Sequence, residues 1–257
     1  MLNELIWQST DFTKFKCAFV IKNLKTGVPI SYHEKVIVPA ASLIKIPIMI
    51  EILRQVKADE LSLKQRIVVN QTDKISGSIL TLLETGNSYS INDLLTLMIV
   101  QSDNTAANLL IDLAGIAAID RLIGSLDLKD TILQRRMLDQ AAAKAGRENL
   151  TTAADMGRLF ELLYQGEVLD RANSVAMLET MKNQLDLSMM RLYLPDETVI
   201  AHKTGELDFL SHDAGIVYRQ NGDYILVVLI WDAVTNNFAR QAIGLISKIV
   251  YDYFTGG

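Results

Sequence analysis

The stretch VPAASLIKIPIMIEIL, at residues 38–53, marks the change from strands to helices along this sequence. Its apolar residues recur at helical spacing, so it predicts a helix that is buried in the core. Near its start it carries a serine and a lysine, Ser42 and Lys45. Positions i and i+3 of a helix lie on one face, so the hydroxyl and the ammonium can project to the same side. A polar pair therefore lies near the N-terminal end of an otherwise apolar predicted helix.

This pair has a possible catalytic meaning and a structural one. A serine becomes a good nucleophile when an adjacent base takes its proton, and a lysine can be that base when its pKa is lowered. Burial lowers a lysine pKa, and so does a second cation nearby. Ser42 is also close to a helix N-terminus, where backbone N–H groups favour developing negative charge. The structural alternative is a serine that caps the helix and a lysine whose amine reaches water.

Predicted strands lie on both sides of the helical section. Before it, residues 15–24 and 28–38 are joined across a KTG turn, where glycine adopts positive φ at low cost, so a hairpin is predicted. After about Arg191 the alternating pattern returns, and ETVIAHKTG, DAGIVYRQ and DYILVVLIWD predict three strands. The last two are joined by Asn221-Gly222, which favours a tight hairpin.

Helices are predicted through the middle of the chain and at its end. Between about residues 41 and 184 nearly every segment has a helical period. Asn92 and either Thr151 or Thr152 are predicted N-caps, and Gly166 is a predicted helix end. The last segment, NNFARQAIGLISKIVYDYF, has the apolar stripe of a helix that lies on a sheet. The stripe consists of Phe238, Ala242, Ile246, Ile249 and Tyr253.

The fold class that we predict from this order is α+β. The first two and last three strands would form a five-stranded antiparallel sheet that is flanked by helices, with a large all-helical domain inserted into it. Residues 1–40 together with 191–257 would form the sheet domain, and residues 41–190 the inserted all-α domain. A cleft between two such domains is the expected place for a site.

Composition excludes several classes of protein. A chain of 257 residues with 49% hydrophobic and 21% charged residues can bury a large core, which excludes a disordered or fibrous protein. The net charge of −5, without a basic tract, argues against a nucleic-acid partner or an anionic membrane surface. No uninterrupted apolar run reaches the about 20 residues that a membrane span needs.

The N-terminus and the single cysteine bear on the compartment. MLNELIWQSTDFTKF has no basic region followed by a long apolar run, so no secretory leader is predicted in this sequence. Either the chain works inside the cell, cytoplasmic as written, or a leader has been left off. Cys17 is the one cysteine, so no intramolecular disulfide can form. Its apolar surroundings predict a buried thiol rather than a reactive one.

Two further short motifs follow the serine–lysine pair. Ser102-Asp103-Asn104 lies between two predicted helices, where a turn with a cap would explain it, and Lys203-Thr204-Gly205 lies late in a predicted strand. Together S-x-x-K, S-D-N and K-T-G are the motif set of class A β-lactamases and penicillin-binding proteins. The sequence resembles the class A-like branch in the order and spacing of these motifs, and in its layout over almost the whole chain.

The resemblance implies a role for each matched residue in the two motifs that precede the last strands. Ser42 would be the acylated nucleophile, and Lys45 its proton acceptor or relay. Ser102 would pass a proton toward the leaving nitrogen, as a general acid. Asn104 would hydrogen-bond the side-chain amide of the substrate, while Asp103 would brace the loop.

The resemblance also implies that the third motif binds substrate. Lys203 and Thr204 would take the substrate carboxylate, and Lys203 is the cation that would lower the pKa of Lys45. Gly205 lets a ligand approach the strand backbone closely. The oxyanion hole would consist of two backbone amides, those of Ser42 and Glu206.

One loop departs from the family pattern. Class A enzymes release the acyl group with a water that is held by a loop glutamate, and Met137 stands at that position within TILQRRMLDQAAAKAGREN, residues 131–149. A thioether cannot act as a base. Asp139 and Glu148 are the remaining loop carboxylates. A local shift could point Asp139 inward, but we expect each to be a loop brace or a solvated charge, and Glu148 to pair with a nearby arginine. Acylation would then be intact and deacylation slow.

A second departure is at the strand SHDAGIVY, which lacks the arginine that many class A enzymes keep at its start. His212 and Asp213 stand there instead, and with Ser42 they could suggest a hydrolase triad. Adjacent residues of a strand point to opposite faces, which argues against that triad. His33 and His202 are predicted strand residues. One cysteine and three scattered histidines give no zinc-ligand spacing, so we expect no metal and no cofactor.

The expected function is a serine β-lactamase-like hydrolase that opens β-lactam amides through an acyl-Ser42 intermediate, with slow deacylation. Alternatives are a D-alanyl-D-alanine peptidase or esterase that uses the same site, or a covalent penicillin-binding sensor module without turnover. The expected partner is a small molecule: a β-lactam, a peptidoglycan-like compound or an ester. We expect a monomer without a membrane span, although members of the family are usually exported.

Overall fold

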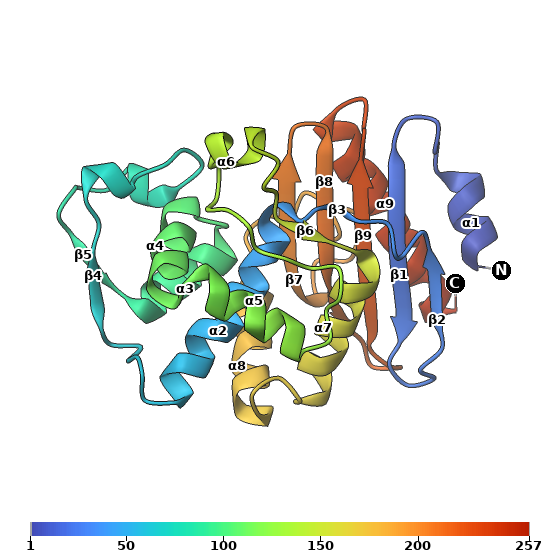
Figure 1. Ribbon diagram of the computed structural model, residues 1–257. Coiled ribbons are helices and arrows are strands. Elements are labelled where there is room, and N and C mark those ends of the chain that lie inside the picture. The colour runs from blue at the N-terminus through green and yellow to red at the C-terminus, as the bar shows by residue number, and fades with distance from the viewer. Residues whose placement is uncertain (1, 257) are drawn as a thin grey trace.

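The structure is a computed structural model that describes residues 2–256. Five strands form one antiparallel sheet in the order β2-β1-β9-β8-β7, so an early strand pairs with the last strand within it (Figure 1). The strands are β1 Lys16–Asn23, β2 Pro29–Tyr32, β7 Val199–Leu207, β8 Leu210–Tyr218 and β9 Tyr224–Trp231. The predicted α+β fold with a five-stranded antiparallel sheet is confirmed.

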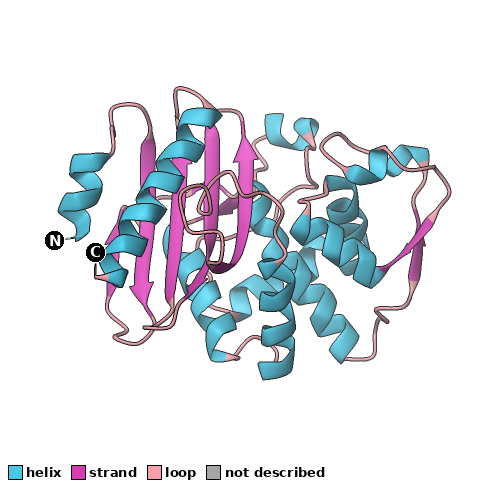
Figure 2. Cartoon of the chain, turned by 180° about the vertical axis from the view of Figure 1, so that it is seen from behind, coloured by secondary structure: helices cyan, strands magenta, loops and turns pink. Residues whose placement is uncertain are grey.

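Two helices cover one face of this sheet. Helix α9, Asn236–Thr255, crosses the face seen in Figure 2, and α1, Leu2–Ser9, packs beside it. The sequence analysis missed α1. The predicted stripe of α9 is partly wrong, because Tyr253 is 47% exposed while Ile243 and Val250 are fully buried. The stripe is rotated toward the face that meets β8 and β9.

The other face of the sheet packs against the helical section (Figure 1). Its helices are α2 Lys45–Lys57, α3 Ile91–Val100, α4 Asn104–Ala114, α5 Ile116–Ser125, α6 Gln140–Lys144, α7 Ala153–Gln165 and α8 Arg171–Lys182. Helix α2 is the central one, and its residues Ile46, Ile48, Ile50 and Ile52 are all fully buried. The prediction that this apolar stretch forms a core helix is confirmed.

Short strands also lie within or beside the helical section. The predicted strand 28–38 is broken into β2 and a short β3, and three further short strands lie where helices were expected. The short strands are β3 Val38–Pro39 paired with β6 Leu150–Thr151, and β4 Arg66–Val68 paired with β5 Ser88–Ser90. Strands of two or three residues are too short to show an alternating pattern. Three 3₁₀ turns complete the section: η1 Ala41–Ile44, η2 Gln71–Asp73 and η3 Ile79–Thr81.

Most of the predicted turns and caps are confirmed. Gly27 and Gly222 lie in the two hairpin connections with φ of 75° and 126°, and Gly166 ends α7 in the left-handed conformation. Thr152 caps α7 by accepting a hydrogen bond from the Asp155 amide. The prediction of Asn92 as a cap is wrong: Ser90 is the N-cap of α3 and forms a capping box with Asp93.

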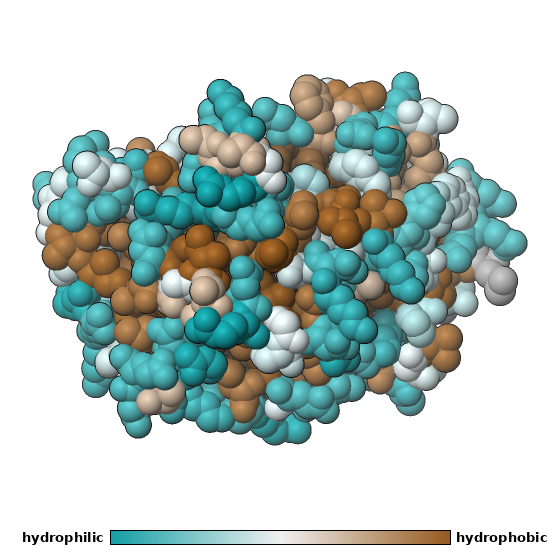
Figure 3. All heavy atoms as spheres, in the orientation of Figure 1, coloured by the Kyte–Doolittle hydropathy of each residue, from teal (hydrophilic) through white to brown (hydrophobic). Residues whose placement is uncertain are grey.

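The surface mixes hydrophilic and hydrophobic residues, with apolar patches separated by polar ones on the face seen in Figure 3. Within residues 2–256, no helix combines the length and the apolar character that crossing a membrane requires. Cys17 is buried, as predicted, and burial raises the pKa of its thiol to about 12. A thiol with such a pKa stays protonated at neutral pH and is a poor nucleophile.

Candidate functional site

Ser42 lies in the 3₁₀ turn η1, immediately before α2, and not within the α-helix itself. This turn packs directly against β7 at Gly205. A Cβ atom on Gly205 would stand 3.0 Å from the Ser42 amide nitrogen and 3.1 Å from the Ala41 Cβ. The glycine of the K-T-G motif is therefore required by the close approach of β7 to the turn that carries Ser42.

Two buried lysines meet at the hydroxyl of Ser102. Lys45 Nζ donates to the Ser102 carbonyl at 2.5 Å and to Ser102 Oγ at 3.1 Å. Lys203 Nζ donates to the same Oγ at 2.9 Å and to the carbonyl of Thr204 at 2.7 Å. The three motifs, which are far apart in the sequence, thus converge on one chain of polar atoms.

Burial sets the charge of both lysines. The pKa of Lys45 is held well below its usual value, first by burial and then by the positive charge of Lys203, against the opposing charge of Asp103. Burial also lowers the pKa of Lys203, to about 7, although the carboxylates of Asp213 and Asp186 oppose the shift. A neutral lysine amine can accept a proton, so Lys45 has the electrostatic surroundings of a base.

Asp103 braces the loop between α3 and α4, as the sequence analysis expected. Its buried carboxylate caps α4 by accepting from the Ala106 amide at 2.8 Å and also accepts from the Leu80 amide at 3.0 Å. Ser102 has a positive φ of 56°, which is uncommon for a residue other than glycine. The two anchors of Asp103 hold Ser102 in this conformation and direct it toward the lysines.

Asn104 lines the same small cavity as Ser42, where its predicted role would place it. Its side-chain amide is already engaged in the protein. Oδ1 accepts from Lys45 Nζ at 2.7 Å, and Nδ2 donates to the carbonyl of Ser76 at 3.3 Å. The role of Asn104 in holding a substrate amide stays a prediction.

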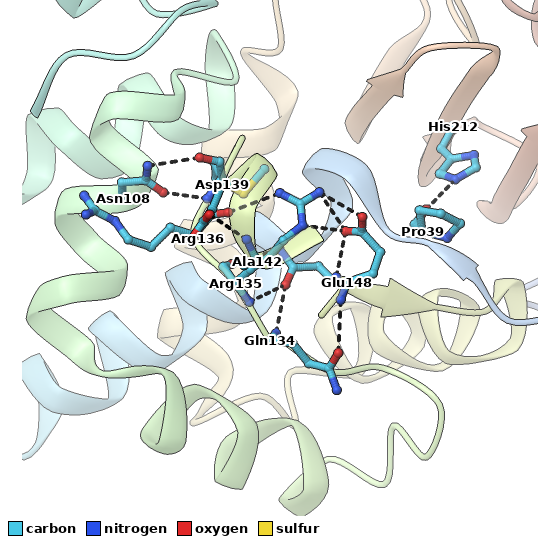
Figure 4. Close-up of polar contacts among 11 residues, drawn as sticks. Pro39, Asn108, Gln134, Arg135, Arg136, Asp139, Ala142, Glu148 and His212 are labelled. Carbon is cyan, nitrogen blue, oxygen red and sulfur yellow. Dashed lines mark hydrogen bonds and ion pairs between the residues drawn. The ribbon is translucent and has the colours of Figure 1, made fainter. Parts of the chain in front are cut away.

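Met137 is buried in the wall of the Ser42 cavity. Asn108 of α4 holds its backbone from both sides (Figure 4): the Met137 amide donates to Oδ1 at 2.7 Å, and Nδ2 donates to the Met137 carbonyl at 3.2 Å. The sequence analysis missed Asn108, although it lies one helical turn after Asn104. That spacing was the available signal, because residues i and i+4 share one face of a helix.

The two loop carboxylates are both occupied (Figure 4). Glu148 forms an ion pair with Arg135 at 2.7 Å and accepts from the Asn149 amide at 2.8 Å, so the predicted pairing with an arginine is confirmed. Asp139 caps α6 by accepting from the Ala142 amide at 2.9 Å, which confirms the predicted brace. Glu148 does line the cavity that Ser42 lines, but its oxygens are held by these partners.

The cavity beside Ser42 is small, about 40 Å³, and it is not the largest in the molecule. A cleft of about 730 Å³ adjoins it, lined by Ile75 and Ser76 on the helical side and by Asp208 on the β7 side. Arg135, Leu138, Glu206 and Leu207 line both spaces. Ser42 and Asn104 line the smaller cavity, and Asn104 accepts from Lys45 Nζ, so this cavity adjoins the polar chain around Ser102. The larger cleft is room beside it.

The side chain of Glu206 is held by residues that do not belong to the polar chain around Ser102. Its carboxylate pairs with Arg240 of α9, whose Nε donates at 2.8 Å, and accepts from Ser211 Oγ at 2.9 Å and Asn236 Nδ2 at 3.1 Å. These contacts join β7 to β8 and α9. The sequence analysis missed Arg240 and Asn236, because nothing local in the sequence connects them with the K-T-G motif.

The structure excludes the triad of Ser42, His212 and Asp213. Nε2 of His212 lies 3.0 Å from the carbonyl oxygen of Pro39, while Asp213 contacts His202, whose Nδ1 is 2.9 Å from Oδ1. Neighbouring residues of β8 point to opposite faces, as expected. The buried pair of His202 and Asp213 was not predicted. Among residues 2–256 no group of three or more His, Cys, Asp or Glu side chains is placed to hold a metal ion.

The fold and this polar chain define a serine hydrolase. The chain belongs to the β-lactamase enzyme family, whose sequence model matches residues 2–254. β-Lactamase VEB-1 of Pseudomonas aeruginosa is 22% identical over 247 residues, which cover 84% of this chain and 78% of that protein. A β-lactamase of Streptomyces fradiae is 29% identical over 201 residues, which cover 75% of this chain and 66% of that protein.

Solved structures share the whole fold. The β-lactamase from Sphaerobacter thermophilus DSM 20745 superposes with a TM-score of 0.90 at 28% identity, covering 98% of this chain and 96% of that chain. The structure of PBP-A superposes with a TM-score of 0.89 at 24% identity, covering 100% and 96%. At that identity, the second likeness concerns the fold alone.

Proposed function

We propose that this protein opens β-lactam amides through an acyl-Ser42 intermediate, which it then hydrolyses slowly. One observation carries the proposal: Ser102 Oγ lies between the Nζ atoms of Lys45 and Lys203, at 3.1 and 2.9 Å, beside the turn that presents Ser42. In this arrangement Lys45, three residues after Ser42, would be the base for the nucleophile, and Ser102 would be the hydroxyl that protonates the leaving nitrogen.

Acylation would proceed through three linked proton transfers. Ser42 Oγ attacks the lactam carbonyl carbon while its proton moves to the neutral amine of Lys45. The C–N bond then breaks, Ser102 gives its proton to the lactam nitrogen, and Lys45 returns a proton to Ser102. Once Lys45 has taken the Ser42 proton, its ammonium and that of Lys203 can both donate to Ser102 Oγ, which leaves the Ser102 hydrogen free to point toward the substrate.

Substrate binding would use the end of β7. Lys203 and Thr204 take the substrate carboxylate, and the amides of Ser42 and Glu206 stabilise the oxyanion. The contact between Gly205 and the Ser42 turn supports this assignment, because it brings the end of β7 against the backbone of Ser42, and Ser42 and Glu206 line one small cavity. Asn104 would bind the acyl-side amide after exchanging one of its present partners.

Deacylation lacks an evident base. Met137 stands where class A enzymes hold the water with a glutamate, and a thioether takes no proton at neutral pH. Asp139 and Glu148 are each held by other groups of the loop. The acyl-enzyme should therefore persist. The same observations favour a second candidate function, a covalent penicillin-binding module in which Ser42 is acylated once and not released.

Intact-mass spectrometry after mixing with benzylpenicillin tests both functions. We expect an adduct of one benzylpenicillin per chain that decays slowly, and no adduct on the Ser42→Ala variant. An adduct that never decays would favour the covalent module. If no adduct forms while p-nitrophenyl esters or D-alanyl-D-alanine peptides are hydrolysed, the esterase or peptidase alternative is correct. An adduct on Ser42→Ala would contradict the assignment of the nucleophile.

A further inference from the structure

His212 is a buried histidine that the proposed reaction does not use. It lies on β8 opposite Gly205 of β7, with which it is paired in register, and its side chain is fully buried. Nε2 is 3.0 Å from the carbonyl oxygen of Pro39, three residues before Ser42 (Figure 4). The ring therefore bridges the sheet and the segment that leads into the nucleophile turn.

The neighbours of the ring define its protonation. The amide of Ile230 donates to Nδ1 at 3.2 Å, so Nδ1 must carry a lone pair and Nε2 must carry the hydrogen. In this tautomer Nε2 donates to the Pro39 carbonyl. The carbonyl of Ser211 is also 2.9 Å from Nδ1, but a hydrogen there would oppose the Ile230 amide. Burial lowers the pKa of His212 to about 4, so the ring is neutral at physiological pH.

The segment that His212 holds is under conformational strain. Ala41 has a positive φ of 46°, which costs an alanine free energy and persists only where surrounding contacts impose it. Four contacts hold this segment: His212 to the Pro39 carbonyl, the Ala40 amide donating to the Asn149 carbonyl at 2.7 Å, the pairing of β3 with β6, and Gly205 against the Ser42 turn. The His212 contact is the only one of the four in which a polar side chain takes part.

We propose that His212 is a positioning residue for acylation: as the neutral Nε2–H tautomer it anchors the Pro39 carbonyl and thereby fixes the Ser42 amide opposite the Glu206 amide. Losing the anchor lets the strained turn relax and widens the gap that the two oxyanion donors span. Small displacements of such donors lower the rate of the chemical step more than they weaken substrate binding. The inference rests on the proposed function, because it concerns the acylation of Ser42.

Kinetic measurements on variants test the proposal. His212→Leu removes the donor, and we expect its acylation rate constant with nitrocefin to fall at least tenfold while the dissociation constant of the initial complex changes little. His212→Gln retains an N–H donor and should recover part of the rate. Ile216→Ala is the matched control, because Ile216 is fully buried on the same strand, four residues beyond His212, and has no side-chain hydrogen-bond donor. We expect it to lower stability and leave the acylation rate constant unchanged.

The outcomes separate this inference from the proposed function. If the wild-type protein forms no adduct with nitrocefin or benzylpenicillin, the proposed function fails. If the wild type is acylated and folded His212→Leu is acylated equally fast, the inference alone fails. Should His212→Leu not fold, ¹⁵N NMR of the wild type at pH 6.5 decides. A neutral ring protonated at Nε2 supports the proposal, whereas a proton on Nδ1 or on both nitrogens overturns it.

Discussion

Lys203 is a cation whose charge changes close to neutral pH. Its side-chain amine is protonated below a pKa of about 7 and neutral above it, because burial disfavours the charged form. A substrate carboxylate would bind to the charged form. We expect the affinity of benzylpenicillin to fall by up to about tenfold between pH 6 and pH 8, since about a tenth of the lysine stays charged one unit above its pKa.

Calorimetry on the Ser42→Ala variant would measure this affinity without acylation. The methyl ester of benzylpenicillin is the control, because it lacks the carboxylate and should bind equally at both pH values. Equal affinity of benzylpenicillin itself at pH 6 and pH 8 would mean that Lys203 does not hold the carboxylate.

Met137 is the residue at which turnover is expected to stop. We expect Met137→Glu to shorten the lifetime of the benzylpenicillin adduct at least tenfold, because a positioned general base contributes about 10²–10⁴ to such rates. Time-resolved intact-mass spectrometry would follow the adduct. Met137→Gln has a similar shape without a base and should leave the lifetime unchanged. Similar lifetimes in both variants would place the water at another residue.

At the scale of elements, the contact between β7 and the 3₁₀ turn η1 fixes the site. A methyl group at Gly205 would meet the Ser42 amide nitrogen at 3.0 Å, and that neighbour is backbone that cannot move aside cheaply. We expect Gly205→Ala to lower the acylation rate constant at least tenfold, measured with nitrocefin by stopped flow. Gly124→Ala is the control: Gly124 lies within α5, a Cβ there meets nothing, and stability should rise by about 0.5–1 kcal/mol. If Gly205→Ala had the acylation rate constant of the wild type, the turn that carries Ser42 could shift without lowering the rate.

The loop between α5 and α7 is held by the ion pair of Arg135 and Glu148. Arg135 is only 8% exposed, so removing its partner leaves a poorly solvated charge. We expect Glu148→Gln to lower the free energy of unfolding by about 2 kcal/mol in urea titrations. The exposed pair of Lys248 and Asp252 gives a control, since Asp252→Asn should change stability by less than about 0.5 kcal/mol. Equal effects of the two substitutions would contradict a structural role for the loop pair.

At the scale of the whole molecule, the sequence predicted which segments converge but not how they are held. Motif order and spacing were enough to bring Ser42, Ser102 and Lys203 together, because each motif carries a local chemical signature. The supporting contacts have no such signature. Asn108 holds the Met137 backbone and Arg240 pairs with Glu206, and nothing in the local sequence of Asn108 or Arg240 indicates these partners, which depend on packing. The division into domains at residues 1–40 with 191–257 and 41–190 stays a prediction.

The pairing of β1 with β9 has a consequence for folding. Lys16 lies opposite Trp231, so the centre of the sheet joins residues from near the two ends of the chain. Contacts of such high sequence separation slow folding, because a long loop must close before they form. During synthesis the edge of β1 that pairs with β9 therefore stays unpaired until residues 224–231 have been made. Nascent chains of this protein should depend on protection of that edge, and a stall before β9 would leave an aggregation-prone intermediate without a competent site.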